Sequence, residues 1–275
     1  MSDARAPSGR VLIIAGSDSG GGAGIQADIK TVTMLGGYAM TAITAITAQD
    51  TTGVHGVWPI APDAVTAQIR SCLTDIGADA VKTGMLGTAT LVDQVAETLD
   101  TFARETPKLI DPVMVATSGD QLVDEKAVSA IASVLIPGAK LVTPNAPEAE
   151  VLTGKAVDGL NGQRRAAEAL LETGARGALV KGGHIPGAIL HDVLQTEYGE
   201  WIFESPRIET SSTHGTGCTL ASACAALVAQ GQDLADAVEA ARNYLHHAIE
   251  QAEPLGKGHG PVAHNWQIKQ MDQQD

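Results

Sequence analysis

Short segments rich in aliphatic and β-branched residues alternate along the chain with longer segments whose apolar residues recur every three or four positions. The short segments predict β-strands over residues 11–15, 39–48, 80–83, 108–112, 141–143, 178–181, 190–195 and 201–203. The longer segments predict helices over residues 25–35, 62–76, 88–104, 125–135, 164–173, 219–230 and 233–253. This alternation is typical of an α/β fold with a mostly parallel sheet, and the last two strands, which flank Gly199, predict an antiparallel edge.

Glycines and polar residues follow the predicted strands directly. In an open α/β sheet the ligand binds at the carboxyl ends of the strands, so these residues are the first candidates for a functional site. They are the glycine-rich loop 16–24, Gln49, the pair Gly84 and Met85, Asp111, the segment 145–148 and the loop 181–184. The entrance to the predicted helix at 219–230 completes the ring.

A thiol and several backbone amides share this helix entrance, in the run His214, Gly215, Thr216, Gly217 and Cys218. The first N–H groups of a helix have no partner within it, and the helix dipole adds partial positive charge, so the entrance suits an anion. The same charge predicts a lowered pKa for the Cys218 thiol. The alternative is a glycine-rich turn closed by a buried cysteine.

Composition narrows the class of protein. The chain has 275 residues without an internal repeat or a long linker, so we expect one domain over residues 9–266, with flexible termini at 1–8 and 267–275. A formal net charge of −14 disfavours nucleic acid as a partner. Because the first residues lack an apolar signal region and no run is long enough to span a membrane, we expect a cytoplasmic protein. Three cysteines without metal spacing predict no disulfide scaffold.

Five candidate side chains suit a metal, a phosphate or another polar ligand. Asn145 and Glu148 offer oxygen donors suited to the waters of a Mg²⁺ ion, or alternatively cap a helix and complement its dipole. Lys181 ends a buried strand and needs an anion, which favours a phosphate contact. Asp111, at another strand end, is either a structural cap or a metal-linked carboxylate. Asp28, on the first helix, faces the ligand crevice or solvent.

The first glycine loop also permits a different class of enzyme. Gly22, Gly24 and Ala27 have the spacing of a dinucleotide-binding turn, with Asp50 where a ribose-binding acid would stand, so a nicotinamide-dependent oxidoreductase is an alternative. A P-loop nucleotide enzyme is disfavoured, because the sequence lacks that motif. Three histidines have no spacing that suggests a shared metal and are expected to be structural or solvated: His184, His191 and His214.

A series of short motifs occurs in order between residues 11 and 262. The motifs are 15–18, 21–28, 47–50, 84–86, 111–114, 143–145 with Glu148, 181–184, 213–219, 256–258 and 260–262. Together they resemble the hydroxymethylpyrimidine and phosphomethylpyrimidine kinases of thiamine biosynthesis, which belong to the ribokinase-like superfamily. The chain departs from many members at Ser17 and at Ser19 with Gly20, where those members have Thr and Pro-Ser.

The resemblance implies a fold and a substrate. The fold is a three-layer α/β/α sandwich, ribokinase-like, with a mostly parallel central sheet and some antiparallel edge strands, and the protein is a homodimer. The reaction is phosphorylation of an aminopyrimidine alcohol by ATP, followed by phosphorylation of the resulting monophosphate. The resemblance further implies that Asp28 and Gln49 hydrogen-bond the pyrimidine, that Met85 lies against its ring, and that Gly16 belongs to the same pocket.

On the nucleotide side, the resemblance implies ATP and Mg²⁺ as cofactors. Glu148 and Asp111 are then the metal-linked carboxylates, while Asn145, Glu148, Lys181 and Thr213 hold the nucleotide.

At the point of phosphoryl transfer, the resemblance places Cys218, Lys181 and the amides of Gly215 and Gly217. Related sugar kinases have an aspartate where Cys218 stands, so we hypothesise that Cys218 is the general base; a positioning role is the alternative. Two other functions stay open, a pyridoxal kinase of the same superfamily and a non-catalytic ligand sensor. The local contexts of Gln49 and Met85 favour the pyrimidine.

Overall fold

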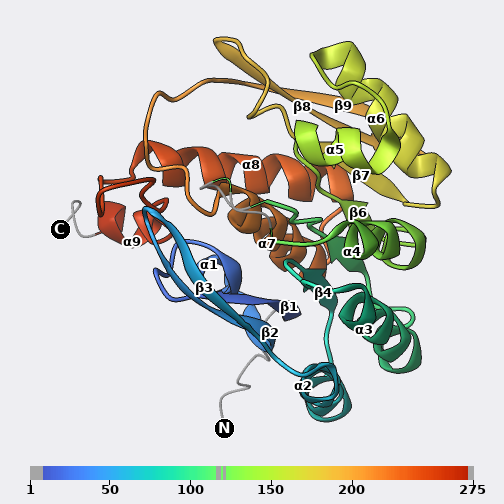
Figure 1. Cartoon of the computed structure of the whole chain (residues 1–275). Coiled ribbons are helices and arrows are strands. Elements are labelled where there is room, and N and C mark those ends of the chain that lie inside the picture. Colours follow the sequence, from blue (N-terminus) through green and yellow to red (C-terminus); the bar gives the residue numbers. More distant parts are fainter. Residues whose placement is uncertain (1–8, 116–118, 120–121, 272–275) are drawn as a thin grey trace, which may run out of the picture.

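A computed structural model describes residues 9–115, 119 and 122–271. The strands are β1 (Arg10–Asp18), β2 (Tyr38–Asp50), β3 (Gly53–Pro59), β4 (Ala80–Thr83), β5 (Lys108–Ile110), β6 (Leu141–Val142), β7 (Gly177–Val180), β8 (Ile189–Thr196) and β9 (Gly199–Pro206). Within the described residues they form one sheet in the order β3-β2-β1-β4-β5-β6-β7-β8-β9 (Figure 1). From β2 to β7 the neighbours are parallel, whereas β3 and the β8–β9 hairpin pair antiparallel at the two edges. The hairpin edge was predicted, and the β3 edge was not.

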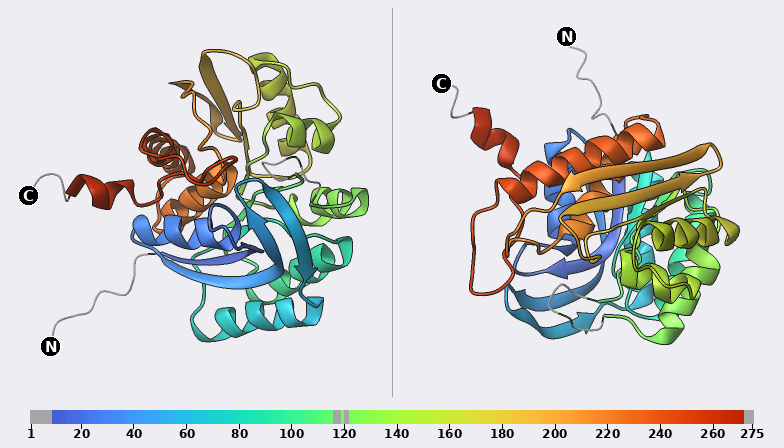
Figure 2. Two further views of the ribbon diagram at one scale, coloured as in Figure 1. Left: turned by 60° about the vertical axis from the view of Figure 1, so that its left-hand side comes forward. Right: turned by 90° about the horizontal axis from the view of Figure 1, so that it is seen from above.

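Helices cover both faces of this sheet. They are α1 (Gly24–Met34), α2 (Pro62–Asp75), α3 (Ala89–Phe102), α4 (Glu125–Ala130), the π-helix η1 (Ile131–Leu135), α5 (Ala146–Thr153), α6 (Leu160–Glu172), α7 (Thr216–Ala229), α8 (Leu234–Glu250) and α9 (Trp266–Met271). Helices α2 to α6 pack on one face, and α1, α7 and α8 pack on the other (Figures 1 and 2). The structure therefore confirms the three-layer α/β/α sandwich.

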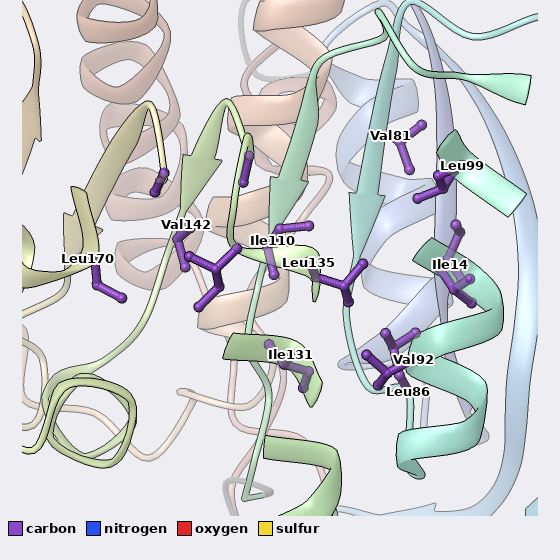
Figure 3. Packing of buried hydrophobic residues seen from close by; sticks show 14 of the residues in the cluster. Ile14, Val81, Leu86, Val92, Leu99, Ile110, Ile131, Leu135, Val142 and Leu170 are labelled. Atoms are coloured by element: carbon purple, nitrogen blue, oxygen red, sulfur yellow. The ribbon is translucent and has the colours of Figure 1, made fainter. Parts of the chain in front are cut away.

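Alternate positions along each strand supply the two cores. In β1, Leu12 and Ile14 join the core beneath α2 and α3, while Val11 and Ile13 join the core beneath α1 and α7. Figure 3 shows the first of these cores, where strand residues such as Ile14 meet helix residues such as Leu99. Burial on both faces explains why the central strands are nearly continuous apolar runs, and it fixes the position of every strand end.

Several elements differ from the sequence prediction. Strand β3 and helix α5 are additional, and the predicted helix at 125–135 is divided into α4 and η1. Strand β1 continues to Asp18, so the first residues of the expected glycine loop belong to the strand. Helix α9 lies where we expected the start of an irregular tail, whereas residues 1–8 and 272–275 lie outside the described residues. No described helix is both long and apolar enough to cross a membrane.

Candidate active site

The carboxyl ends of the central strands bring the predicted polar residues together. The Asp111 amide donates a hydrogen bond to the Thr83 carbonyl, so the β4–β5 ladder continues one step beyond β5. Asn145 and Lys181 form an isolated parallel bridge just beyond β6 and β7. Asp111, Asn145 and Lys181 therefore come from three successive strands to one end of the sheet.

Lys181 and Asp111 form a largely buried ion pair at this end. Nζ of Lys181 lies 3.4 Å from Oδ1 of Asp111, and the two side chains are 13% and 2% exposed. Burial lowers the pKa of Lys181, but the carboxylates of Asp111 and Glu148 outweigh it, so the pKa stands above its ordinary value. A Cβ on Gly217 would lie 3.4 Å from this Nζ. The charged ammonium is thus adjacent to the entrance of α7, where it can contact a phosphate.

Asn145 and Glu148 form a capping box at the start of α5. Oδ1 of Asn145 accepts a hydrogen bond of 2.9 Å from the Glu148 amide, and Oε2 of Glu148 accepts one of 2.8 Å from the Asn145 amide. The capping alternative is therefore what the structure shows. Burial raises the pKa of Glu148 to about 7, and Asp111 adds to this effect while Lys181 opposes it.

A magnesium ion fits the donors at this position. Oδ2 of Asp111 is buried and has no hydrogen-bond partner among the described residues. The described residues contain no group of three or more His, Cys, Asp or Glu side chains placed to hold a metal, so an ion here would take at most two carboxylates from the protein. Two hard carboxylates, Asp111 and Glu148, suit Mg²⁺, which keeps several waters and takes further oxygens from phosphates.

Asp18 and His214 join the two glycine-rich segments through a contact that the sequence did not predict. One oxygen of Asp18 accepts hydrogen bonds from the amides of Gly22 and Ala23 at 3.0 and 2.8 Å and lies 2.9 Å from Nε2 of His214. Burial raises the pKa of Asp18, but His214 and the amides outweigh it and hold the pKa below its usual value. The signal in the sequence was the Asp followed by glycines, which is typical of a turn closed by the aspartate side chain.

Gly215 begins α7 in close contact with the first glycine loop. Its φ is +81°, and a Cβ at this position would lie 1.8 Å from the Gly22 carbonyl oxygen. No side chain caps this end of α7. The first amides of α7, including that of Gly217, therefore start the helix without a side-chain cap, and their binding of an anion stays a prediction.

Cys218 lies in the first turn of α7 and is partly exposed. Its surroundings correct the prediction of a lowered thiol pKa. Burial raises the pKa of Cys218 to about 12, and Asp28 and Asp111 add to this effect. Lys82 and a hydrogen bond with the Gly24 backbone oppose it. Loss of hydration thus outweighs the helix dipole, and the thiol is protonated at neutral pH.

Asp28 lies beneath the site and not at its surface. Its side chain is fully buried, and its two oxygens lie 2.9 and 3.0 Å from Nζ of Lys82. Oγ of Ser222 donates a further hydrogen bond of 2.5 Å to Oδ1. The carboxylate is thus bonded to Lys82 and Ser222 inside the fold, and its expected hydrogen bond to a pyrimidine stays a prediction. Lys82 was missed because a lysine inside the apolar run at 80–83 gives no sign of its partner.

The remaining predicted residues lie at the ends of β1, β2 and β4. A Cβ on Gly16 would lie 2.4 Å from Cε of Met85, so the two residues are in direct contact. The Gln49 side chain is partly buried, and its Oε1 lies 3.2 Å from Oγ1 of Thr47. These residues share one side of the ring of strand ends. Thr213, also partly buried, precedes α7 on the other side, where its carbonyl accepts from the Thr216 amide.

The fold and the site together define an α/β enzyme that holds phosphate groups, because a lysine, two carboxylates and an open helix entrance converge at the ends of parallel strands. The chain belongs to the phosphomethylpyrimidine kinase family, whose sequence model matches residues 18–263. Its sandwich is ribokinase-like.

Relatives cover nearly the whole chain. A hydroxymethylpyrimidine/phosphomethylpyrimidine kinase of Streptomyces coelicolor is 48% identical over 258 residues, which are 94% of this chain and 95% of that protein. The thiamine biosynthesis bifunctional protein ThiED of Geobacter sulfurreducens is 49% identical over 258 residues, and there this chain spans 52% of the relative's length. An ADP complex of Bacillus subtilis pyridoxal kinase has a TM-score of 0.88 and 35% identity, covering 95% of this chain and 99% of that chain.

Proposed function

We propose that this chain transfers a phosphoryl group from ATP to hydroxymethylpyrimidine and then a second one to the monophosphate. Membership of the phosphomethylpyrimidine kinase family and the 48% identity to the Streptomyces enzyme support this substrate. The observation that carries the proposal is the placement of Lys181 beside Gly217. It sets a buried cation against an open helix entrance, where the transferring group would develop negative charge.

In the first step the hydroxymethyl oxygen forms a bond to the γ-phosphorus while the bond from that phosphorus to the β,γ-bridging oxygen breaks and ADP leaves. Lys181 and the amides of Gly215 and Gly217 hold the phosphate oxygens in line. Cys218 is the proposed acceptor of the hydroxyl proton, and because its thiol is protonated at neutral pH, the thiol has to lose its own proton to solvent first. Gln49, Met85 and Gly16 hold the pyrimidine, whereas Asp28 supports the floor beneath it.

In the second step the nucleophile is an oxygen of the monophosphate. A phosphate monoester has a second pKa of about 6, so near neutral pH most of this oxygen's protons are already gone. No general base is then required. Lys181 then has to offset the charge of a second phosphate, although the Asp111 carboxylate beside it already takes up part of its positive charge.

The metal and nucleotide assignments are part of the proposal. Asp111 and Glu148 would hold Mg²⁺ through its waters, and the ion would supply charge neutralisation at the phosphates. Asn145 and Thr213 would contact the nucleotide, and Asn145 also orients Glu148 through the capping box. Ionised Glu148 suits this role; burial, which raises its pKa, opposes ionisation, and the charge of Lys181 favours it.

A homodimer is proposed from the family resemblance. Light scattering on the full chain tests it: a mass near twice 28.3 kDa supports a dimer, and a mass near 28.3 kDa overturns it.

ADP release in the presence of ATP and Mg²⁺ tests the activity. Hydroxymethylpyrimidine, its monophosphate, pyridoxal and no acceptor are supplied in separate reactions. Turnover with both pyrimidines above the acceptor-free rate is the expected result. Turnover with pyridoxal alone would instead assign the chain to the pyridoxal kinases, a candidate favoured by the TM-score of 0.88 to the Bacillus enzyme. No turnover with any acceptor would overturn the kinase proposal.

A further inference from the structure

The strap, a glycine-rich segment at residues 256–261, has no role in the function proposed above. It follows α8 and lies beside the tip of the β2–β3 hairpin (Figures 1 and 2). Three of its six residues are glycines, which lose more conformational freedom on folding than any other residue. A close approach of the backbone to another segment is the usual reason for such a composition, and the contacts of the strap supply it.

Thr51, in the turn between β2 and β3, contacts one end of the strap through its side chain and its backbone. Its Oγ1 accepts hydrogen bonds from the amides of Lys257 at 3.1 Å and Gly258 at 3.2 Å. Its carbonyl oxygen accepts one of 2.8 Å from the His259 amide. A Cβ on Gly258 would lie 2.0 Å from that carbonyl oxygen, and a Cβ on Gly256 would lie 2.2 Å from Oγ1. The glycines therefore allow the backbone of the strap to reach the turn directly.

The other end of the strap contacts the residues just before α7. The His214 amide donates a hydrogen bond of 3.0 Å to the Gly260 carbonyl, and the Gly260 amide donates one of 3.1 Å to the Ser211 carbonyl. His214 and Pro261 also form an isolated parallel bridge. Because the ring of Pro261 fixes its φ, this end of the strap has little backbone freedom. The strap thus connects the hairpin turn with the entrance of α7.

Gln49, a proposed contact of the pyrimidine, lies two residues before Thr51 and is also held by Ser19. Oγ of Ser19 donates a hydrogen bond of 2.8 Å to the Gln49 carbonyl and accepts one of 2.9 Å from the Gln49 amide. Ser19 belongs to the first glycine loop, which contacts Gly215 through the Gly22 carbonyl. A closed series of contacts therefore runs from Gln49 through this loop to α7, and returns through the strap to the hairpin turn.

The parallel sheet does not reach Gln49. The pairing of β2 with β1 ends at Thr47, opposite Asp18. Beyond this point β2 pairs with β3, the edge strand, and the register shifts between Ala48 and Gln49. A ribbon of two strands twists more than a larger sheet and has little stability of its own. The position of Gln49 relative to the entrance of α7 therefore depends on contacts outside the sheet.

We propose that the strap fixes the β2–β3 turn relative to the entrance of α7, and that Thr51 is the positioning residue through which it places Gln49 for the pyrimidine. This inference rests on the proposed function, because it takes Gln49 as a contact of the pyrimidine. Phosphoryl transfer needs the acceptor oxygen in line with the phosphorus, so a pyrimidine bound by Gln49 has to stand at a defined distance from α7. The strap sets this distance, because it contacts both segments.

Gly258→Ala tests the strap, because its Cβ would meet the Thr51 carbonyl while its φ lies outside the left-handed region. We expect the KM for hydroxymethylpyrimidine to rise about tenfold, as for the loss of a positioned hydrogen bond, and the KM for ATP to change less than twofold. Gly159→Ala is the matched control, because Gly159 has an extended backbone and open space around it. It should leave both KM values unchanged. Equal KM values for the pyrimidine in the two variants would overturn the proposal.

Thr51→Val covers the case in which Gly258→Ala does not fold, because it removes the hydroxyl group that accepts from the strap and keeps the shape of the side chain. We expect the KM for hydroxymethylpyrimidine to rise at least threefold, and Thr51→Ser to restore it. Thr52→Val is the control, because Oγ1 of Thr52 donates to Oδ1 of Asp50 at 2.6 Å. A merely structural defect would reduce the amount of active enzyme and lower kcat with KM unmoved, and that result overturns the proposal.

Hydrogen–deuterium exchange of the peptide at residues 47–54 separates this inference from the proposed function, because it needs no substrate. We expect faster exchange in Gly258→Ala than in Gly159→Ala, which should match the unchanged protein. If exchange follows this expectation but the unchanged protein phosphorylates neither pyrimidine, the proposed function fails and only the restraint of the turn stands. If both pyrimidines are phosphorylated but exchange is equal in the two variants, the role of the strap fails alone. Faster exchange with an unchanged KM for the pyrimidine would overturn the positioning of Gln49.

Discussion

Gly215 shows how one residue can fix the geometry of the phosphate site. Its positive φ and its contact with the Gly22 carbonyl place the start of α7 directly against the first glycine loop. Any side chain at this position would both strain the backbone and push the two loops apart. The helix entrance that receives the phosphate thus depends on the absence of a single methyl group.

We expect Gly215→Ala to lower the free energy of unfolding by more than about 2 kcal/mol and to reduce kcat/KM for both pyrimidines. Gly231→Ala is the matched control, because Gly231 also has a positive φ, of +87°, yet has open space around it. Its cost should be about 1 kcal/mol, with unchanged kinetics. Chemical denaturation and steady-state assays of both variants measure the difference, and equal effects in the two would show that backbone strain alone is at work.

Cys218→Ala should separate the two phosphorylation steps. The first step has a hydroxyl proton to remove, so its kcat should fall on the order of 100-fold. The second step starts from an oxygen that is already ionised, so its kcat should fall less than tenfold. Assays with each pyrimidine as the sole acceptor measure the two values. A fall of similar size in both steps would favour a positioning role for Cys218.

At the scale of single residues, the sequence predicted which side chains lie together at the strand ends. It did not predict how deeply each one is buried or whether it is protonated. Strand ends, glycines and charges were enough to place Lys181, Asp111 and Glu148 together, because parallel strands end at the same side of a sheet. The thiol pKa was predicted in the wrong direction, because the helix dipole is a local property whereas burial depends on the whole fold. The ion pair of Lys82 with Asp28 was not predicted, because it too depends on how the whole fold brings β4 and α1 together.

At the scale of elements, α5 is the part that links structure to chemistry. Its capping box satisfies two backbone amides and at the same time orients the Glu148 carboxyl group toward Lys181 and Asp111. The two interpretations offered by the sequence, a cap and a metal-linked pair, are thus compatible. The cap is observed, and its hydrogen bond from the Asn145 amide holds the Glu148 carboxylate in a fixed position, where the proposed metal would bind.

We expect Asn145→Ala to lower the free energy of unfolding by about 1 kcal/mol and to raise the KM for ATP with Mg²⁺. Asp124→Ala removes the comparable cap of α4, where Oδ1 accepts a 2.7 Å hydrogen bond from the Ala127 amide. It should cost a similar stability and leave the KM for ATP as it was. Thermal melts and nucleotide titrations measure both quantities; a matching rise in KM for the two variants would remove α5 from the nucleotide site.

Most elements could be predicted, and the missed ones have physical reasons. Strand β1 and helix α7 are buried on several sides, so their apolar patterns are strong. Strand β3 contains two glycines and is mostly exposed, which leaves no alternation to detect. Helix α5 has only eight residues and begins with Ala146 and Pro147, so its short apolar pattern resembles a loop. The secondary structure of such segments is determined by their tertiary contacts and not by a local sequence pattern.

For the whole molecule, the arrangement of layers makes the two faces of the sheet unequal. The face under α2 to α6 is occupied by the large aliphatic core of Figure 3. The opposite face carries the polar groups that support the site, including the contact between Thr219 of α7 and His264 near the end of the described chain. Nε2 of His264 lies 3.0 Å from Oγ1 of Thr219, and His264 is 5% exposed.

The burial of His264 makes the stability of the molecule depend on pH. Burial lowers the pKa of His264 to about 4, whereas in the unfolded chain it is about 6.5. Between these values the unfolded state binds more protons, so stability falls as the pH falls from 6.5 toward 4. The loss is on the order of 3 kcal/mol. We expect His264→Gln to flatten this part of the curve in urea unfolding between pH 4 and 7. An identical slope in the variant would assign the effect to other groups.

The contact between Asp18 and His214 spans 196 positions of the chain. Translation delivers β1 and its glycine loop near the beginning and α7 only after most of the chain has been made. Until α7 has been made, Gly22 lacks its contact with Gly215, and Asp28 lacks its hydrogen bond with Ser222. Cys218 is also still missing from the chain. Closing so long a loop is an entropic cost that falls on the last stage of folding. We therefore expect a growing chain to lack partial activity. The active site is completed only when the loop at residues 18–24 and the segment at residues 214–218 come into contact, late in synthesis.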